Sequence, residues 1–302
     1  MKFSIVVANY NNGKYLPKLI DTVLAQTYQD WELVIVDDCS TDDSQEVLKS
    51  FAKHPQIKIY HHEVNQGASG AFKTATLKAE GEIIGMLGAD DGLPPNALEE
   101  VTRAYQENPE VVSLYTLAYD CKFDDLSVIE VYTGSRGPSE NATALLDNPL
   151  KNYNFQTFKK SAYLQTSGFD TNLKVAVDQD IFLKIEETGK VMCLAKPLYY
   201  YRQNMNGISR VSVKKSMMNQ KRVMLNTYYR RKSSNARNNI SRDLYLNILR
   251  AYHHEKSEFI RSKSPLQSIW LILRTLYYLP GDIKQKQYWK TLWQALRMKQ
   301  SN

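Results

Sequence analysis

The 302-residue chain is poor in cysteine and has no long hydrophobic run. No stretch reaches the roughly 18 consecutive apolar residues that a transmembrane helix needs. The nearest approach, Ile269–Leu279, is shorter and contains Arg274. We expect no secretory leader, because Lys2 runs directly into a strand-like pattern. Three widely spaced cysteines are typical of reduced thiols rather than of a disulfide framework. Together these absences predict a globular protein of the cytoplasm.

Signatures of zinc sites and of nucleic-acid binding are also missing. The histidine pairs His61-His62 and His253-His254 are adjacent, whereas a helical zinc site needs histidines four residues apart. No helix-turn-helix, RNA-binding or zinc-finger motif accompanies the basic residues. We therefore expect neither zinc ligation nor a nucleic-acid partner.

Acidic residues are scarce in the last third of the chain. Residues 214–302 contain 19 Lys or Arg and 4 Asp or Glu, which gives a net charge of +15. Residues 1–213 contain 20 and 28, which gives −8. Such asymmetry predicts an acidic catalytic domain over residues 1–213 and a basic extension over residues 214–302 that meets an anionic surface.

Apolar and interfacial aromatic residues alternate with basic residues near the end of this extension. That composition fits an amphipathic helical segment lying on anionic lipid, so we expect peripheral contact with the inner face of the membrane. The same apolar stripe also fits a homodimer interface, and a simple solvated helical surface is a third interpretation. The segments concerned are Ile269–Leu273, Leu276–Leu279, Trp289, Leu292, Trp293 and Leu296.

In the first 115 residues, short apolar runs alternate with amphipathic stretches. Strands alternating with helices predict an α/β fold with a mainly parallel sheet flanked by helices. Ser40 or Thr41 is the expected cap of the second helix. The expected strands are Phe3–Ala8, Glu32–Val36, Ile57–Tyr60, Glu82–Leu87 and Val111–Tyr115. The expected helices include Leu16–Leu24, Gly70–Ala79 and Asn96–Gln106.

The pattern is weaker further on. Residues 118–155 show only a possible hairpin over Ser127–Tyr132. A helix is expected from about Asp178 to Thr188, followed by a short strand, Val191–Leu194, and the aromatic run Leu198–Tyr201. Beyond about Val213 the chain reads as helical and basic.

Two carboxylate pairs, Asp37-Asp38 and Asp90-Asp91, directly follow apolar strand-like runs. In an open α/β sheet, ligands bind outside the carboxyl ends of the strands, so both pairs are expected in one crevice. Adjacent carboxylates repel each other and are poor for stability. The pattern therefore predicts a site for a cation or for polar groups that donate hydrogen bonds.

Several stretches, in order along the chain, resemble the family 2 glycosyltransferases of the GT-A type, which move a sugar from a nucleotide-sugar donor. The first stretch is long and specific, whereas the later ones gain weight from their order and spacing. The resemblance covers about residues 1–210. The stretches are Ser4–Ser44, Asn65–Ala71, Met86–Gly92 (MLGADDG), Ser167–Asp170, Val177–Ile185 and Pro197–Asn204 (PLYYYRQN).

The resemblance implies a donor site at the strand ends. Ala8 and Tyr10 would line the nucleotide base pocket, and Asp38 would hydrogen-bond the base, usually uracil. Asp90 and Asp91 would stand at the donor ribose and at the metal-bound diphosphate. Mg²⁺ or Mn²⁺ suits this place, because both prefer carboxylate and phosphate oxygens and stabilise the charge of a diphosphate leaving group.

The resemblance also implies the residues that act on the acceptor. Asp178 would be the catalytic base that takes the proton from the attacking hydroxyl, a role that typically contributes about 10²–10⁴-fold. Asp180 is the less favoured alternative, because it would point to a different face of the helix. Arg202, in the closing YR motif, would meet donor phosphate or acceptor. A single in-line displacement then inverts the anomeric centre.

Three positions depart from the family pattern. Gly88 stands where the family often has the first Asp of Asp-x-Asp-Asp, and Val177 where it often has Glu before the catalytic Asp. Asn204 stands where His is common.

The sequence therefore predicts an inverting glycosyltransferase with a UDP-linked donor and a saccharide or lipid-linked glycan acceptor. A non-catalytic nucleotide-sugar binder or scaffold remains an alternative. A nucleotidyltransferase is disfavoured, because Asn9–Lys14 is not the Gly-rich phosphate loop with Arg or Lys that such an enzyme would carry near its first strand.

Overall fold

The structure is a computed structural model. It describes residues 1–122, 125–131, 154–203, 213–234, 242–260, 263–278, 289–290 and 292–294. The chain divides into two compact units, Met1–Met205 and Asn206–Asn302. Each unit is considered by itself.

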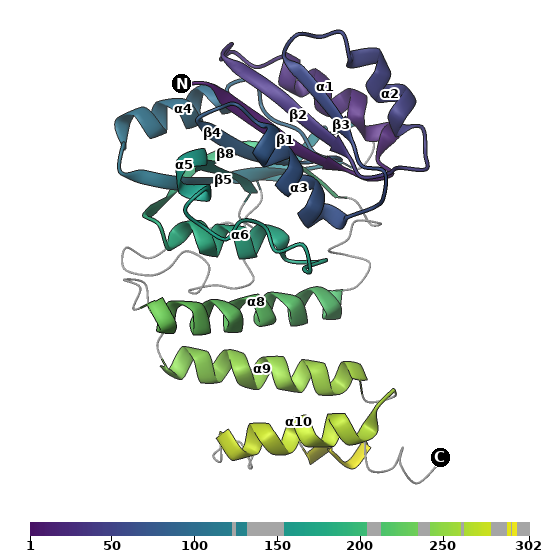
Figure 1. The fold of residues 1–302 in the computed structure, drawn as a ribbon, viewed down its shortest axis with the longest axis vertical. Coiled ribbons are helices and arrows are strands. Elements are labelled where there is room, and N and C mark those ends of the chain that lie inside the picture. Colours follow the sequence, from purple (N-terminus) through teal and green to yellow (C-terminus); the bar gives the residue numbers. More distant parts are fainter. Residues whose placement is uncertain are drawn as a thin grey trace. The chain divides into compact units, whose positions relative to one another are not determined.

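The first unit is built on an eight-stranded sheet with the order β3-β2-β1-β4-β7-β5-β6, in which β8 also pairs with β5 (Figure 1). β1 pairs in parallel with β2 and β4, β2 with β3, and β5 with β8. The mainly parallel sheet flanked by helices is thus confirmed. The strands are β1 Phe3–Asn9, β2 Trp31–Asp37, β3 Ile57–His61, β4 Ile83–Gly88, β5 Val111–Cys121, β6 Val128–Val131, β7 Asn154–Lys159 and β8 Lys190–Arg202.

β7 is the strand that the sequence pattern does not predict, and it pairs antiparallel with both β4 and β5. Its sequence, NFQTFK, places polar residues in a buried strand, so no apolar run marks it. Thr157 shows how that burial is tolerated. Its hydroxyl lies 3.0 Å from the Tyr105 hydroxyl and donates to the Leu114 carbonyl at 3.1 Å. Buried polar groups with such partners cost little.

Helices cover the sheet, and two of them begin two or more residues away from the predicted position. The second helix was expected to be capped by Ser40 or Thr41, but it begins at Ser44 with Asp43 as the N-cap residue. Ser40 instead donates its hydroxyl to Asp37. The helices of this unit are η1 Gly13–Tyr15, α1 Leu16–Leu24, α2 Ser44–Phe51, α3 Gly67–Lys78, α4 Ala97–Glu107, α5 Lys160–Tyr163 and α6 Val177–Glu186.

The other helix, α3, begins three residues before the predicted Gly70. The reason is a long-range cap. The backbone N–H groups of Gln66 and Gly67 donate to the Asp38 carboxylate, which lies 28 and 29 residues earlier in the chain. Gly67 has a φ of +77°, a conformation that favours glycine. A cap of this kind leaves no local signal in the sequence.

The hydrophobic core fixes the strand ends that carry the polar residues. β2 is buried at all seven positions. Leu16, Leu19, Ile20 and Val23 of α1 pack into the same core cluster as β1 and β2. Fully burying each such side chain contributes about 1.5–3 kcal/mol. The central strands are therefore held firmly, and the side chains at their carboxyl ends have defined positions.

The second unit contains three described helices, α8 Val213–Ser234, α9 Arg242–Ile260 and α10 Pro265–Tyr278, so the predicted helical extension is confirmed. α9 packs against both α8 and α10 (Figure 1). Two hydrogen bonds cross the α9–α10 contact, between His253 Nδ1 and Thr275 Oγ1 at 3.0 Å and from Ser268 Oγ to the Ser257 carbonyl at 2.8 Å. Among the helices that the structure describes, none is long and apolar enough to span a membrane.

Candidate functional site

The carboxyl ends of β1, β2 and β4 meet at one edge of the sheet. In the strand register Ala8 lies opposite Val36 on one side and opposite Gly88 on the other, and Asn9 lies opposite Asp37. The segments that follow these strands carry Tyr10, Asp38 and Asp90-Asp91. The fold thus brings together the predicted donor-site residues of three strands. Ala8 is half-buried and Tyr10 is 47% exposed, so the tyrosine ring is accessible to a ligand.

The first carboxylate of the β2 pair, Asp37, holds the loop after β1. It is fully buried, and its Oδ1 accepts hydrogen bonds from Asn9 Nδ2 at 2.8 Å and from Ser40 Oγ at 2.5 Å. Asn11 in the same loop has a φ of +55° and accepts from the Thr41 backbone N–H at 2.8 Å. These bonds explain why Asn and Ser follow the strands. They fix the backbone from which Tyr10 extends.

The second carboxylate, Asp38, is buried and joins β2 to α3. Its Oδ1 accepts from the Gln66 N–H at 2.9 Å and lies 2.7 Å from His62 Nδ1, and its Oδ2 accepts from the Gly67 N–H at 2.7 Å. A carboxylate can accept about four hydrogen bonds, so one position on Oδ2 is left for another donor. The predicted contact with the base would use that position.

Asp91 lies behind the β4 end in a buried cluster. Its Oδ2 accepts a hydrogen bond from the Tyr199 hydroxyl at 2.6 Å, and its Oδ1 accepts one from the Arg202 backbone N–H at 2.9 Å. Burial, together with the neighbouring charge of Asp90, raises the pKa of Asp91 to about 8. Burial and the Asp91 charge raise the pKa of Tyr199 well above its ordinary value, so this hydroxyl keeps its proton and donates.

Arg202 joins this cluster to the segment after β1. It is 2% exposed, and its Nε donates to the backbone carbonyl of Asp90. Its guanidinium lies 4.7 Å from the centre of the Tyr15 ring in η1, a cation–π contact. The side chain of Asp90 itself is half-buried. Asp90 is thus the more accessible carboxylate of the pair, and Asp91 is the anchored one.

Asp178 is the second residue of α6, the helix that follows Ala176 in a left-handed conformation (φ +60°). Its side chain is exposed to solvent, yet the protein around it partly desolvates the carboxylate. This desolvation raises the pKa of Asp178 and outweighs the hydrogen bond from the Gln179 N–H, which lowers it. An accessible carboxylate with a raised pKa is suited to accept a proton.

Asp180, the predicted alternative, is buried and forms an ion pair with Lys184 at 2.6 Å. Lys184 also donates to the Gly168 carbonyl at 2.8 Å, so the pair ties α6 to the turn before it. Within the described part of the chain, the hydrogen bonds link Asp90, Asp91 and Arg202 into one cluster. Asp178 lies outside that cluster.

Sequence reasoning missed two residues of the site, His62 and Tyr199. Tyr199–Tyr201 reads as an ordinary core strand, and nothing in three consecutive tyrosines indicates that the first one donates to Asp91. His62 directly follows β3 and would be expected on the surface. Its position one residue beyond a parallel strand end was the only signal available.

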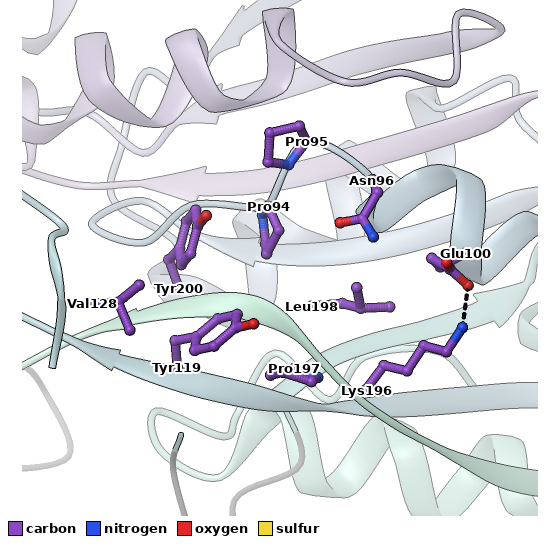
Figure 2. Close-up of a pocket in the computed structure, with 10 residues that line it drawn as sticks. All are labelled: Pro94, Pro95, Asn96, Glu100, Tyr119, Val128, Lys196, Pro197, Leu198 and Tyr200. Atoms are coloured by element: carbon purple, nitrogen blue, oxygen red, sulfur yellow. Dashed lines mark hydrogen bonds and ion pairs between the residues drawn. The ribbon is translucent and has the colours of Figure 1, made fainter. Parts of the chain in front are cut away.

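A groove of about 560 Å³ lies beside the carboxylate loop (Figure 2). The rings of Tyr119 and Tyr200 are 5.8 Å apart on one side, and the Glu100–Lys196 ion pair (2.6 Å) closes the other. Gly92 and Tyr200 exchange backbone hydrogen bonds of 3.2 and 2.9 Å, so the groove begins where the Asp90-Asp91 loop ends. None of the residues predicted from the sequence as site residues lines it.

The described residues contain no group of three or more His, Cys, Asp or Glu that could hold a metal ion. A metal that bridges a diphosphate needs only one or two carboxylates, because phosphates and water supply the other oxygens. Asp90-Asp91 fits that demand. Each Asp91 oxygen accepts one hydrogen bond and keeps a second lone pair. Burial, and then the neighbouring charge of Asp90, raises the pKa of Asp91, so a cation here would stabilise the charged carboxylates.

Comparisons with known proteins agree with this arrangement. The sequence pattern described as Glycosyl transferase family 2 matches residues 4–163. An uncharacterized glycosyltransferase of Nostoc sp. is 28% identical over 304 residues, which are 93% of this chain and 89% of that protein. The chondroitin synthase of Pasteurella multocida is 31% identical over 197 residues, which are 65% of this chain but only 20% of the synthase.

Among solved structures, the fold is similar to that of residues 1–349 of TarS from S. aureus in complex with UDP. The TM-score is 0.64 at 17% identity, and the match covers 100% of this chain and 92% of that chain.

Proposed function

The chain belongs to glycosyl transferase family 2, and from this premise we propose that it moves a sugar from a UDP-linked donor to a hydroxyl of a saccharide or lipid-linked glycan. The observation that carries the proposal is the meeting of Tyr10, Asp38 and Asp90-Asp91 at one edge of a parallel sheet. Ligands of open α/β sheets bind at that edge. We assign the transfer reaction to residues 1–213 and a surface-binding role to residues 214–302.

The donor nucleotide would lie across the ends of β1 and β2. The exposed ring of Tyr10 offers a stacking surface for the base beside Ala8, and the remaining acceptor position of Asp38 suits the imide N–H of uracil. Two solved structures of one similar protein support UDP in particular. The structure of TarS with the same fold holds UDP, and TarS has also been solved with UDP-GlcNAc.

The diphosphate would lie over the β4 end, where Asp90 and Asp91 would hold Mg²⁺ or Mn²⁺. When bound, the cation acts as a Lewis acid that stabilises the negative charge of the departing diphosphate. Asp90 is the accessible member of the pair, and Asp91 is oriented by Tyr199 and Arg202. Arg202 is buried against the Asp90 carbonyl and Tyr15, so we propose that it shapes the phosphate site from behind.

Asp178 would take the proton from the acceptor hydroxyl as that oxygen attacks the anomeric carbon. Its accessibility and raised pKa support this role, whereas Asp180 is occupied by Lys184. With the base on one face of the sugar and the diphosphate on the other, a single displacement inverts the anomeric configuration.

The extension would bring the enzyme to its acceptor at an anionic membrane surface. Four large apolar residues lie on one face of α10 and are exposed by 53–81%: Leu266, Trp270, Leu273 and Tyr277. Arg274 lies beside them, with its guanidinium 5.0 Å from the centre of the Trp270 ring. Apolar bulk, interfacial aromatics and an excess of basic residues favour binding to anionic lipid. The alternative is that a second copy of the chain covers the same face, and vesicle sedimentation distinguishes the two.

The experiment that tests transfer is release of UDP from a panel of UDP-sugars, measured with and without Mn²⁺ and with oligosaccharide or lipid-linked acceptors. Metal-dependent release that an acceptor accelerates, and that Asp178→Asn abolishes, is the expected result. No release from any UDP-sugar, under conditions where GDP-sugars are consumed, would contradict the assignment of the donor.

A further inference from the structure

The hydroxyl of Tyr199 bridges the end of β4 and the carboxylate that follows it. It accepts a hydrogen bond from the Gly88 backbone N–H at 3.1 Å and donates one to Asp91 Oδ2 at 2.6 Å. The tyrosine is 6% exposed, and its ring lies 6.3 Å from that of Phe155 in the core. The position of the hydroxyl is therefore set by packing that does not involve the carboxylates.

Gly88 leaves the space that this arrangement needs. A Cβ atom added at position 88 would lie 2.5 Å from Asp91 Oδ2 and 3.2 Å from the Tyr199 hydroxyl oxygen. Real Cβ atoms essentially never approach another heavy atom so closely. A side chain at position 88 and the observed position of the Asp91 carboxylate therefore exclude each other.

The end of β8 holds the other side of the carboxylate pair. Asp91 Oδ1 accepts from the Arg202 N–H, and Arg202 Nε donates to the Asp90 carbonyl. Tyr199 and Arg202 are three residues apart on one strand, so β8 holds the Asp91 carboxylate through two hydrogen bonds and the Asp90 backbone carbonyl through a third. Asp91 consequently has one hydrogen-bond donor on each oxygen and a fixed orientation.

We propose that Tyr199 is a positioning residue for donor binding: its hydroxyl fixes the Asp91 carboxylate in the space that Gly88 leaves empty. The inference rests on the proposed donor site. Hydrogen bonds to a ligating carboxylate orient it, and their loss typically costs about 10–100-fold in metal affinity. The arrangement would hold Asp91 in a fixed orientation for binding a cation and diphosphate together with Asp90.

The test is calorimetric titration of UDP into wild type and Tyr199→Phe, each with and without Mn²⁺. Phenylalanine keeps the ring and removes only the hydroxyl. We expect Mn²⁺-dependent UDP binding to weaken about 10–100-fold, whereas UDP binding without metal stays unchanged. Tyr200→Phe is the matched control, because the Tyr200 hydroxyl makes no hydrogen bond within the described part of the chain. It should bind like wild type. Thermal unfolding of each variant checks that it is folded.

Gly88→Ala perturbs the same Asp91 carboxylate by a steric clash instead of by loss of a hydrogen bond. The added methyl must displace Asp91 Oδ2, so metal-dependent UDP binding should weaken as in Tyr199→Phe. The double variant should lose little more than either single variant, because both act through one carboxylate. Equal Mn²⁺-dependent affinity of folded Tyr199→Phe and wild type would overturn the inference. Failure of wild type itself to bind UDP would instead overturn the proposed function.

Discussion

His62 Nδ1 lies 2.7 Å from Asp38 Oδ1, and His62 Nε2 lies 2.9 Å from the Thr74 hydroxyl of α3. The histidine thus holds Asp38 against α3. The same carboxylate accepts hydrogen bonds from the backbone N–H groups at the start of this helix. The residue proposed to meet the base is therefore oriented by the β3–α3 connection. With the donor site as proposed, selectivity for the base would depend on a segment that need not touch the ligand.

His62→Ala should weaken UDP binding and reduce the preference for UDP over GDP. The variant removes one of three groups that orient Asp38, and the loss of such a hydrogen bond typically costs about 0.5–1.5 kcal/mol, or 2- to 10-fold in affinity. Calorimetry with both nucleotides measures the effect. His61→Ala is the control, since His61 is exposed and faces Asp37 at 3.6 Å. If both variants kept the selectivity of wild type, Asp38 would not be the residue that reads the base.

Asp91→Asn should stabilise the metal-free protein progressively as the pH rises from 5 to 8. The pKa of Asp91 is raised from 3.8 to about 8 in the folded chain. Its contribution to stability is therefore fully present below pH 3.8 and is lost as the pH rises towards 8. Asparagine stays neutral throughout. Urea unfolding in EDTA should show the variant gaining on the order of 4 kcal/mol relative to wild type over this range. A difference that does not change with pH would contradict the raised pKa.

Asp178→Asn should lower the transfer rate by about 10²–10⁴-fold and leave UDP affinity unchanged, because the residue would act only on the acceptor. In wild type, the raised pKa of Asp178 predicts that the rate falls during acidification at a higher pH than an ordinary aspartate would give. Steady-state rates and calorimetry measure both effects.

Asp180→Asn is the matched control on the same helix turn. It leaves Lys184 buried without its ion-pair partner, which should lower the free energy of unfolding by about 3–5 kcal/mol. The remaining folded enzyme should keep most of its turnover. If instead Asp180→Asn were inactive at an equal folded fraction, the catalytic base would be Asp180.

Trp270→Glu should reduce sedimentation of the protein with vesicles that contain anionic lipid. The substitution places a carboxylate in the middle of the exposed apolar face of α10 and removes the ring beside Arg274. Gln267→Glu adds the same charge on exposed α10 surface without removing apolar area. Only Trp270→Glu should lose most of the binding. Unchanged vesicle binding, with a dimer that dissociates in Trp270→Glu, would show that a second copy covers this face.

The elements with regular hydrophobic patterns could be predicted from sequence, and those that depend on long-range polar contacts could not. β1, β2, β4 and α1 follow from their apolar runs. β7 could not, because its buried polar residues find partners on β5 and α4 that only the folded chain brings near.

The same distinction applies to the site. The strand-end aspartates are visible as local pairs, and the register of the parallel strands then brings them together. The bond between Tyr199 and Asp91 joins residues 108 positions apart. Neither the consecutive tyrosines nor the glycine at position 88 indicates that contact, because it exists only when β8 lies against the end of β4.

The most direct test of the account is calorimetric titration of UDP and GDP, with and without Mn²⁺, into wild type and Asp91→Ala. The account predicts UDP binding that strengthens with Mn²⁺ in wild type and loses this strengthening in the variant, with weaker binding of GDP. Binding of neither nucleotide to the folded wild type, or equal Mn²⁺-dependent binding to Asp91→Ala, would contradict the donor site at the ends of β1, β2 and β4.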